Sequence, residues 1–214
     1  MAYCTYVEVN DFTNISSSDI ADADVTKIIA GATRELNGLI NVRVVRERIG
    51  QIDNTRKNKI DGSNTTYYVR NWKGKYLADM DNDGDVDTDD LIVYQVDSDG
   101  NETTLTVDSI DQDDCSFTLD SAPSSGVTLY VTYEWCYRDV STPDNKVKQA
   151  CIFLSAAYCY AKLNIGRAPT FVVGNKRIYR DMESFEKYYQ MAMKLVDEIN
   201  YEGMSKVEQS KSNL

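Results

Sequence analysis

Residues Ser18–Ile40 read SDIADADVTKIIAGATRELNGLI, and this stretch sets the character of the first part of the chain. Its apolar residues recur at helical spacing, which predicts one amphipathic helix. They are Val25, Ile28, Ile29, Ala32, Leu36 and Leu39. Asp22 or Asp24 is the expected N-cap. Before it, Thr5–Ile15 predicts a short helix capped by Thr5. After it, Asn41–Ile49, NVRVVRERI, either prolongs the helix or becomes extended.

The middle of the chain changes from helical to strand periodicity. Its apolar segments are rich in β-branched and aromatic residues and partly alternate. They read TTYYV, LIVYQV, TLTVDSI, CSFTL and VTLYVTYEW. Turn-forming residues separate them at Asp61-Gly62, at Asp97–Asn101 and at Asp120–Gly126. We therefore predict a small antiparallel sheet or barrel of about five strands.

Helical spacing returns after residue 143. Ser141 or Thr142 is the expected N-cap of a helix with one apolar stripe. The stripe contains Val147, Cys151, Leu154, Tyr158 and Ala161. Residues 164–179 contain Gly and Pro and predict a loop or a short hairpin.

A last helix is expected to begin at the N-cap Asp181 and to end at Gly203. The polar residues after it have too little apolar surface to order without a partner. The fold class is thus α+β, a helical core with an inserted antiparallel β domain. We expect an N-terminal helical part over 1–59, an acidic β insert over 60–138, a C-terminal helical part over 139–202 and a flexible tail over 203–214.

The charge of the chain is unevenly distributed. The formal net charge is −11, but residues 61–139 alone carry −14 and the remainder carries +3. Such an acidic chain does not bind nucleic acid by neutralising phosphates. No apolar run long enough to span a bilayer and no secretory signal is present, so we expect a soluble protein kept without Sec export.

The composition also excludes common chemistries. There is no histidine, so the usual general base and zinc ligand are missing, and no phosphate-binding or dinucleotide-binding motif is found. We expect no enzymatic activity. The five cysteines are odd in number and have no C-x-x-C spacing, which favours buried free thiols over a disulfide framework.

The densest cluster of charge is DMDNDGDVDTDD, residues 79–90. Aspartates occupy positions one, three, five, seven, nine, eleven and twelve, and Gly84 occupies position six. A hard cation takes six to eight oxygen ligands, and this spacing lets them converge on one point. The expected ligands are the side chains of Asp79, Asp81, Asp83 and Asp90 and the backbone carbonyl of Asp85. Asp87 would act through water, and Val86 would pack inward.

This spacing resembles the calcium loop of EF-hands, and more closely that of dockerins, because position twelve is Asp and not Glu. A strand-like segment follows the loop where a dockerin has a helix, so the resemblance stops at the loop. It implies one structural Ca²⁺, with Mg²⁺ as a possible occupant, that fastens the β insert. The other interpretation is a solvated acidic turn.

The helical segments carry a second resemblance. Residues 3–45 resemble the opening of head–tail connector proteins, also called adaptor or head-completion proteins, of tailed phages and archaeal tailed viruses. Residues 144–201 are similar to their closing helices. The resemblance implies a ring, commonly a dodecamer, that binds the portal protein and a downstream neck or tail protein and extends the DNA channel. It implies no catalytic residue, no sequence-specific DNA binding, no membrane contact, assembly in the host cytoplasm and a place at the virion neck.

The alternative function is an extracellular calcium-binding adhesion or scaffold module, which the acidic loop and the sheet favour. The helical framework, the odd number of cysteines and the missing signal peptide argue against it.

Overall fold

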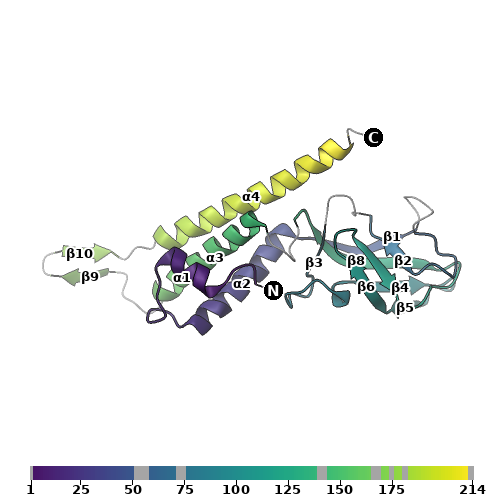
Figure 1. Ribbon diagram of the computed structural model, residues 1–214, viewed down its shortest axis with the longest axis horizontal. Helices are drawn as coiled ribbons and strands as arrows, with labels where there is room; N and C mark the ends of the chain where they lie inside the picture. Colours follow the sequence, from purple (N-terminus) through teal and green to yellow (C-terminus); the bar gives the residue numbers. More distant parts are fainter. Residues whose placement is uncertain are drawn as a thin grey trace. The chain divides into compact units, whose positions relative to one another are not determined.

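The computed structural model describes residues 2–50, 58–70, 76–138, 144–164, 170–173, 176–179 and 183–211, and it has an α+β fold (Figure 1). The chain divides into two compact units. The helical unit contains Ala2–Leu39 and Pro143–Glu202, and Ile40–Thr142 is the main segment of the β unit. The predicted boundary at residue 59 is wrong, because the segment after the first long helix is a strand of the β unit.

Two helices open the helical unit. In α1 (Tyr6–Thr13), the side chain of Thr5 accepts the N–H of Glu8, and Glu8 in turn accepts the N–H of Thr5. This capping box confirms the predicted N-cap. The second helix, α2 (Asp22–Ile40), already includes Asp22 and Asp24 in its first turn. Neither is therefore the N-cap. Both carboxylates interact favourably with the positive end of the helix dipole.

The third helix, α3 (Asn145–Asn164), begins later than predicted. The carboxylate of Asp144 accepts the N–H groups of Lys146 and Val147 at 2.9 and 3.0 Å, so Asp144 caps the helix. The candidate caps Ser141 and Thr142 lie outside the described residues. Helix α3 is buried around much of its circumference, because it carries small residues on several sides. Among them are Ala150, Ala156 and Ala157.

The segment after α3 is a hairpin, and the last helix is longer than predicted. Strands β9 (Thr170–Val173) and β10 (Lys176–Tyr179) pair antiparallel. Helix α4 (Glu183–Lys211) continues through Gly203, so the predicted flexible tail is wrong over 203–211. A single interior glycine costs about 1 kcal/mol, and the Met, Lys, Glu and Gln residues around it favour helix. The expected cap Asp181 lies outside the described residues.

The β unit contains two antiparallel sheets in place of the single sheet or barrel predicted. The larger has β1 (Val42–Ile49), β3 (Tyr76–Ala78), β4 (Ile92–Val96), β5 (Glu102–Leu105) and β8 (Thr128–Cys136). The smaller has β2 (Thr66–Tyr68), β6 (Val107–Asp111) and β7 (Ser116–Leu119). The expected strand TLTVDSI is divided, because β5 pairs with β4 while β6 pairs with β7.

The two sheets share one apolar core. Tyr67 and Phe117 of the smaller sheet and Val131 and Tyr133 of the larger sheet are at most 1% exposed. Alternate residues of β8, from Leu129 to Trp135, belong to this core, as the period of a strand requires. A separate cluster around Ala32, Phe153, Leu154 and Ala192 holds the helical unit. Each unit therefore has its own hydrophobic core.

Candidate metal centre

The acidic loop connects two strands that pair with the same neighbour. Strand β3 ends at Ala78, opposite Glu134 of β8, and β4 begins at Ile92, opposite Thr132 of β8. Two residues along a strand span about 7 Å, so β8 holds the two ends of the loop close together. The 3-10 helix η1 (Thr88–Asp90) completes the loop before β4. The closed shape of the loop therefore depends on sheet pairing as well as on its own sequence.

Three of the predicted ligands converge. One carboxylate oxygen each of Asp79, Asp81 and Asp83 lies within 4.8 Å of the other two. Backbone N–H groups orient the side chains: Asp79 Oδ2 accepts Gly84 N–H at 3.0 Å, and Asp81 Oδ1 accepts Asp83 N–H at 2.9 Å. Gly84 has a φ of +109°, which a residue with a side chain rarely adopts. The glycine at position six thus permits the bend that brings the three carboxylates together.

Asp79 leaves one oxygen without a partner inside the protein. Its side chain is 7% exposed, and Oδ1 is buried with no hydrogen bond. A buried carboxylate oxygen without a partner is energetically costly, and a cation would offset that cost. Burial raises the pKa of the Asp79 carboxyl above its usual range, although backbone N–H groups of Asn82 and Gly84 oppose the shift. This oxygen is the strongest sign that the loop fits a cation.

Asp90 is engaged mainly with the loop backbone. Its side chain is 2% exposed. Oδ1 accepts the N–H groups of Met80 and Asp81, and Oδ2 accepts the N–H of Asp87. Three of the roughly four acceptor positions of a carboxylate are thereby used, and one remains for a cation. Asp90 joins the end of the loop to its beginning, and its role as a ligand stays a prediction.

The remaining loop residues have distinct roles. Asp85 is exposed and donates its N–H to Asp83 Oδ1 at 2.9 Å, while its carbonyl as a ligand stays a prediction. Asp87 is exposed and is the N-cap of η1, because its side chain accepts the N–H of Asp89. Val86 packs against the core of the β unit, as predicted from its position in the loop.

These residues can hold one hard cation. Asp79, Asp81 and Asp83 would supply carboxylate oxygens, and a bound ion would supply positive charge that neutralises them. Among the side chains that the structure describes, no ion pair involves these three aspartates. Calcium tolerates irregular oxygen cages, whereas Mg²⁺ requires near-octahedral geometry, and the identity of the ion stays a prediction.

The loop also predicts a pH dependence. Burial raises the pKa of Asp90 to about 6, so the folded state binds this proton more tightly than the unfolded state. The resulting stabilisation is complete below about pH 4 and is lost as the pH rises through 6. Without divalent cations, the β unit should therefore melt at a lower temperature at pH 7 than at pH 5, and added calcium should raise the melting temperature more at pH 7.

Thermal melts followed by tryptophan fluorescence, with chelator or calcium at each pH, measure this difference. Carboxyls whose pKa is lowered, such as Asp61 and Asp97, are already ionised above pH 5 and do not contribute in this window. Asp90→Asn should remove most of the dependence. If the β unit melted at a higher temperature at pH 7 than at pH 5 in the presence of a chelator, this interpretation of Asp90 would be wrong.

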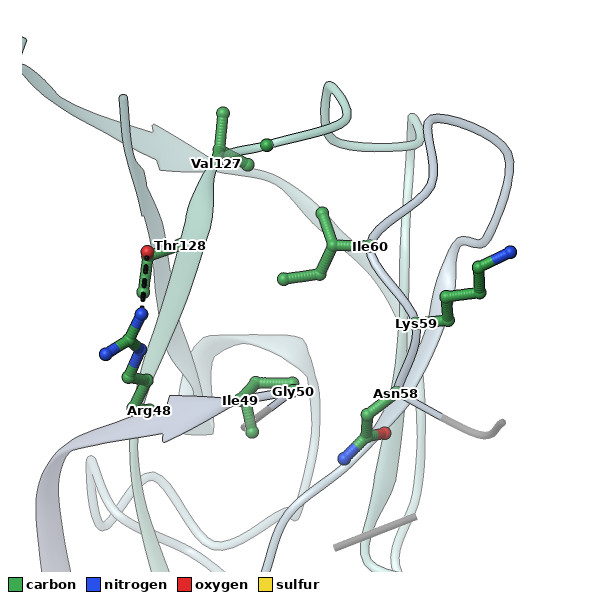
Figure 2. Close-up of a pocket in the computed structure, with 9 residues that line it drawn as sticks. Arg48, Ile49, Gly50, Asn58, Lys59, Ile60, Val127 and Thr128 are labelled. Carbon is green, nitrogen blue, oxygen red and sulfur yellow. Dashed lines mark hydrogen bonds between the residues drawn. The ribbon is translucent and has the colours of Figure 1, made fainter. Parts of the chain in front are cut away.

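A separate hollow lies in the β unit (Figure 2). It has a volume of about 450 Å³ and is lined by Arg48, Ile49, Gly50, Asn58, Lys59, Ile60, Gly126, Val127 and Thr128. Arg48 donates a hydrogen bond to Thr128 at 3.4 Å, and Figure 2 shows Ile60 pointing into the hollow and Lys59 pointing away. None of these lining residues carries a carboxylate, thiol or imidazole, and the amine of Lys59 forms an ion pair with Asp61 at 3.3 Å.

The fold and the loop define the protein as an α+β protein with a candidate cation loop in an inserted β unit. No protein-family model matches the chain, and no curated protein is similar to it in sequence. In the described part of the chain, no helix is both long enough and apolar enough to cross a bilayer.

Proposed function

We propose that the protein is a structural component of tailed virions, a head–tail connector that catalyses no reaction. It forms a ring, a dodecamer by analogy with the family it resembles, between the portal protein and the next neck or tail component. The observation that supports this is the helical unit itself, in which two segments form one compact unit although the β unit is inserted between them in the sequence. This is the arrangement that the resemblance implies.

The helical unit exposes apolar side chains that a ring would bury. Tyr6 and Val7 of α1 are 40% and 48% exposed, Leu39 of α2 is 38% exposed and Tyr201 of α4 is 72% exposed. A cyclic assembly needs two different complementary surfaces on each subunit. Exposed aromatic and aliphatic residues on separate helices could form the apolar centres of two such surfaces.

The charge distribution supports passage of DNA without tight binding. The β unit carries most of the acidic excess, and we place it on the outside of the ring as a solvating surface. The helical unit, residues 2–39 and 143–202, holds 11 basic and 13 acidic residues and so lacks the positive charge of a protein that holds DNA by its phosphates. DNA would then pass through the channel without sequence-specific contacts. Assembly would take place in the host cytoplasm, and the final location would be the virion neck.

Electron microscopy tests the proposal in two steps. Negative-stain images and mass photometry of the full chain, alone and with the portal protein of the same virus, should show rings or rings assembled on the portal. A reconstruction of the virion should then place the chain at the neck. A protein that stays monomeric with the portal and lies elsewhere in the particle would overturn the proposal and favour the adhesion module.

A matched pair of variants identifies the ring surface. Val7→Asp introduces a charge on α1 of the helical unit, and Val45→Asp does the same at a residue of β1 that is 65% exposed. If α1 lies in the subunit interface, Val7→Asp should reduce ring formation severalfold, because it would bury an unpaired charge. Val45→Asp should leave ring formation unchanged.

A further inference from the structure

Two thiols of the helical unit are in direct contact. Cys4 lies just before the N-cap of α1, and Cys151 lies in the second turn of α3. Their Sγ atoms are 3.5 Å apart, with Cys4 donating a weak hydrogen bond to Cys151. Cys4 is 5% exposed and Cys151 is fully buried. No other atom fits between sulfur atoms at this distance.

Neighbouring contacts hold the two chain segments in this position. On one side of Cys4, the hydroxyl of Tyr3 donates a hydrogen bond to Asn37 of α2. On the other side, Glu8 forms an ion pair with Lys148, which precedes Cys151 by less than one turn of α3. Cys4 therefore lies between two contacts that fix the start of the chain on the helical unit.

The rest of α1 follows α3 as well. The rings of Phe12 and Phe153 are 5.2 Å apart, and the hydroxyl of Tyr160 donates to the carbonyl of Thr13 at 3.1 Å. Figure 1 shows α1 lying against α3. The contact between the thiols is therefore part of a packed helix pair.

The surroundings distinguish the two thiols. The hydrogen bond with Cys151 and burial both raise the pKa of Cys4. The same hydrogen bond lowers the pKa of Cys151, and the hydroxyl of Thr33, 3.6 Å from its sulfur, acts in the same direction. Because the thiolate is the nucleophile in disulfide exchange, the contacts that lower the pKa of Cys151 favour it over Cys4 as the attacking sulfur.

We propose that Cys4 and Cys151 are a disulfide-forming pair that joins the start of the chain to α3 under oxidising conditions. The oxidant is a low-molecular-weight disulfide such as oxidised glutathione. It reaches the pair when the segment before α1 separates transiently from α3 by local opening.

The reaction proceeds by two exchanges. The Cys151 thiolate attacks one sulfur of the small disulfide, forms a mixed disulfide and releases one small thiolate, which takes up a proton. The Cys4 sulfur, after losing its proton, attacks the Cys151 sulfur and releases the second small thiol. The two protein thiols lose two electrons and two protons, and the small disulfide gains them.

The bond would close a loop that contains the whole β unit. A cross-link across so long a segment strongly restricts the unfolded chain, and it leaves the already adjacent residues of the folded state nearly where they are. The proposal concerns the isolated chain and does not depend on the connector function.

Peptide mapping by mass spectrometry tests the pair directly. Full-length protein is incubated with oxidised glutathione under native conditions, and free thiols are then alkylated. We expect two of the five thiols to be lost and a peptide linking Cys4 to Cys151 to appear. The melting temperature of the helical unit should rise by about 5–10 °C and return after reduction.

Two variants complete the experiment. Burial raises the pKa of Cys159 to about 11, so Cys159→Ser should leave both the cross-link and the shift in melting temperature unchanged. Cys4→Ser should abolish both. Five alkylated thiols after oxidation of the native wild-type protein, or a linked peptide that involves another cysteine, would overturn the proposal even if Cys4→Ser failed to fold.

Discussion

Calcium in millimolar excess is expected to raise the melting temperature of the β unit by about 5–10 °C, and a chelator is expected to reverse the change. The physical reason is the loop at residues 79–90, where Asp79, Asp81 and Asp83 converge and Asp79 Oδ1 is buried without a partner. A cation that binds only the folded loop stabilises it by mass action. Tryptophan fluorescence measures the transition.

Matched substitutions separate a bound cation from a general salt effect. Asp79→Asn removes the charge of the buried carboxylate at nearly constant volume and should abolish the response to calcium. Asp97→Asn changes an exposed aspartate in the turn between β4 and β5, whose side chain accepts the N–H groups of Asp99 and Asn101. It should retain the full response. If neither calcium nor chelator moves the melting temperature of the wild-type protein, the loop is a solvated acidic turn.

Core substitutions are expected to destabilise the two units separately. Phe117→Ala in β7 should cost the β unit about 3–5 kcal/mol, because the side chain is 1% exposed and packs beside Tyr67 in the shared core of the two sheets. Leu154→Ala in α3 should cost the helical unit about 2–5 kcal/mol, because Leu154 is fully buried.

The chain offers a separate probe for each unit. Trp135 lies in the core of the β unit, so its fluorescence reports on that unit. Far-ultraviolet circular dichroism reports mainly on the helices. Phe117→Ala should lower the melting temperature seen by fluorescence and leave the one seen by circular dichroism unchanged. Leu154→Ala should lower the melting temperature seen by circular dichroism and leave the one seen by fluorescence unchanged. If both variants shifted both transitions equally, the two cores would unfold as one cooperative unit.

Local sequence signals predicted the helices with partial success. The N-cap at Thr5 was predicted correctly because capping depends on residues close in sequence, here Thr5 and Glu8. The start of α3 was misplaced because several residues there are able to cap a helix, and Asp144 forms the bonds. The end of α4 was wrong because Gly203 resembles a stop signal, whereas an interior glycine only weakens a helix.

Strand pairing was less predictable. The local pattern of the segment that forms β1 fits a helix or a strand, and the segment is a strand because it pairs with Leu129 to Trp135 of β8. Strand β3 covers Tyr76–Ala78 and is too short to show a periodicity. The division of TLTVDSI between two sheets follows from pairing with β4 and β7, which no local pattern records.

The sequence by itself determined the acidic loop and most of the segments that form helices and strands. The spacing of the aspartates and Gly84 was sufficient to predict that Asp79, Asp81 and Asp83 converge, because these residues lie within a few positions of one another. Only the tertiary structure decided which residues became buried. The contact of Cys4 with Cys151 arises from packing between segments that are 147 residues apart in the chain, and no short-range pattern encodes such a contact or the burial of Asp79 Oδ1.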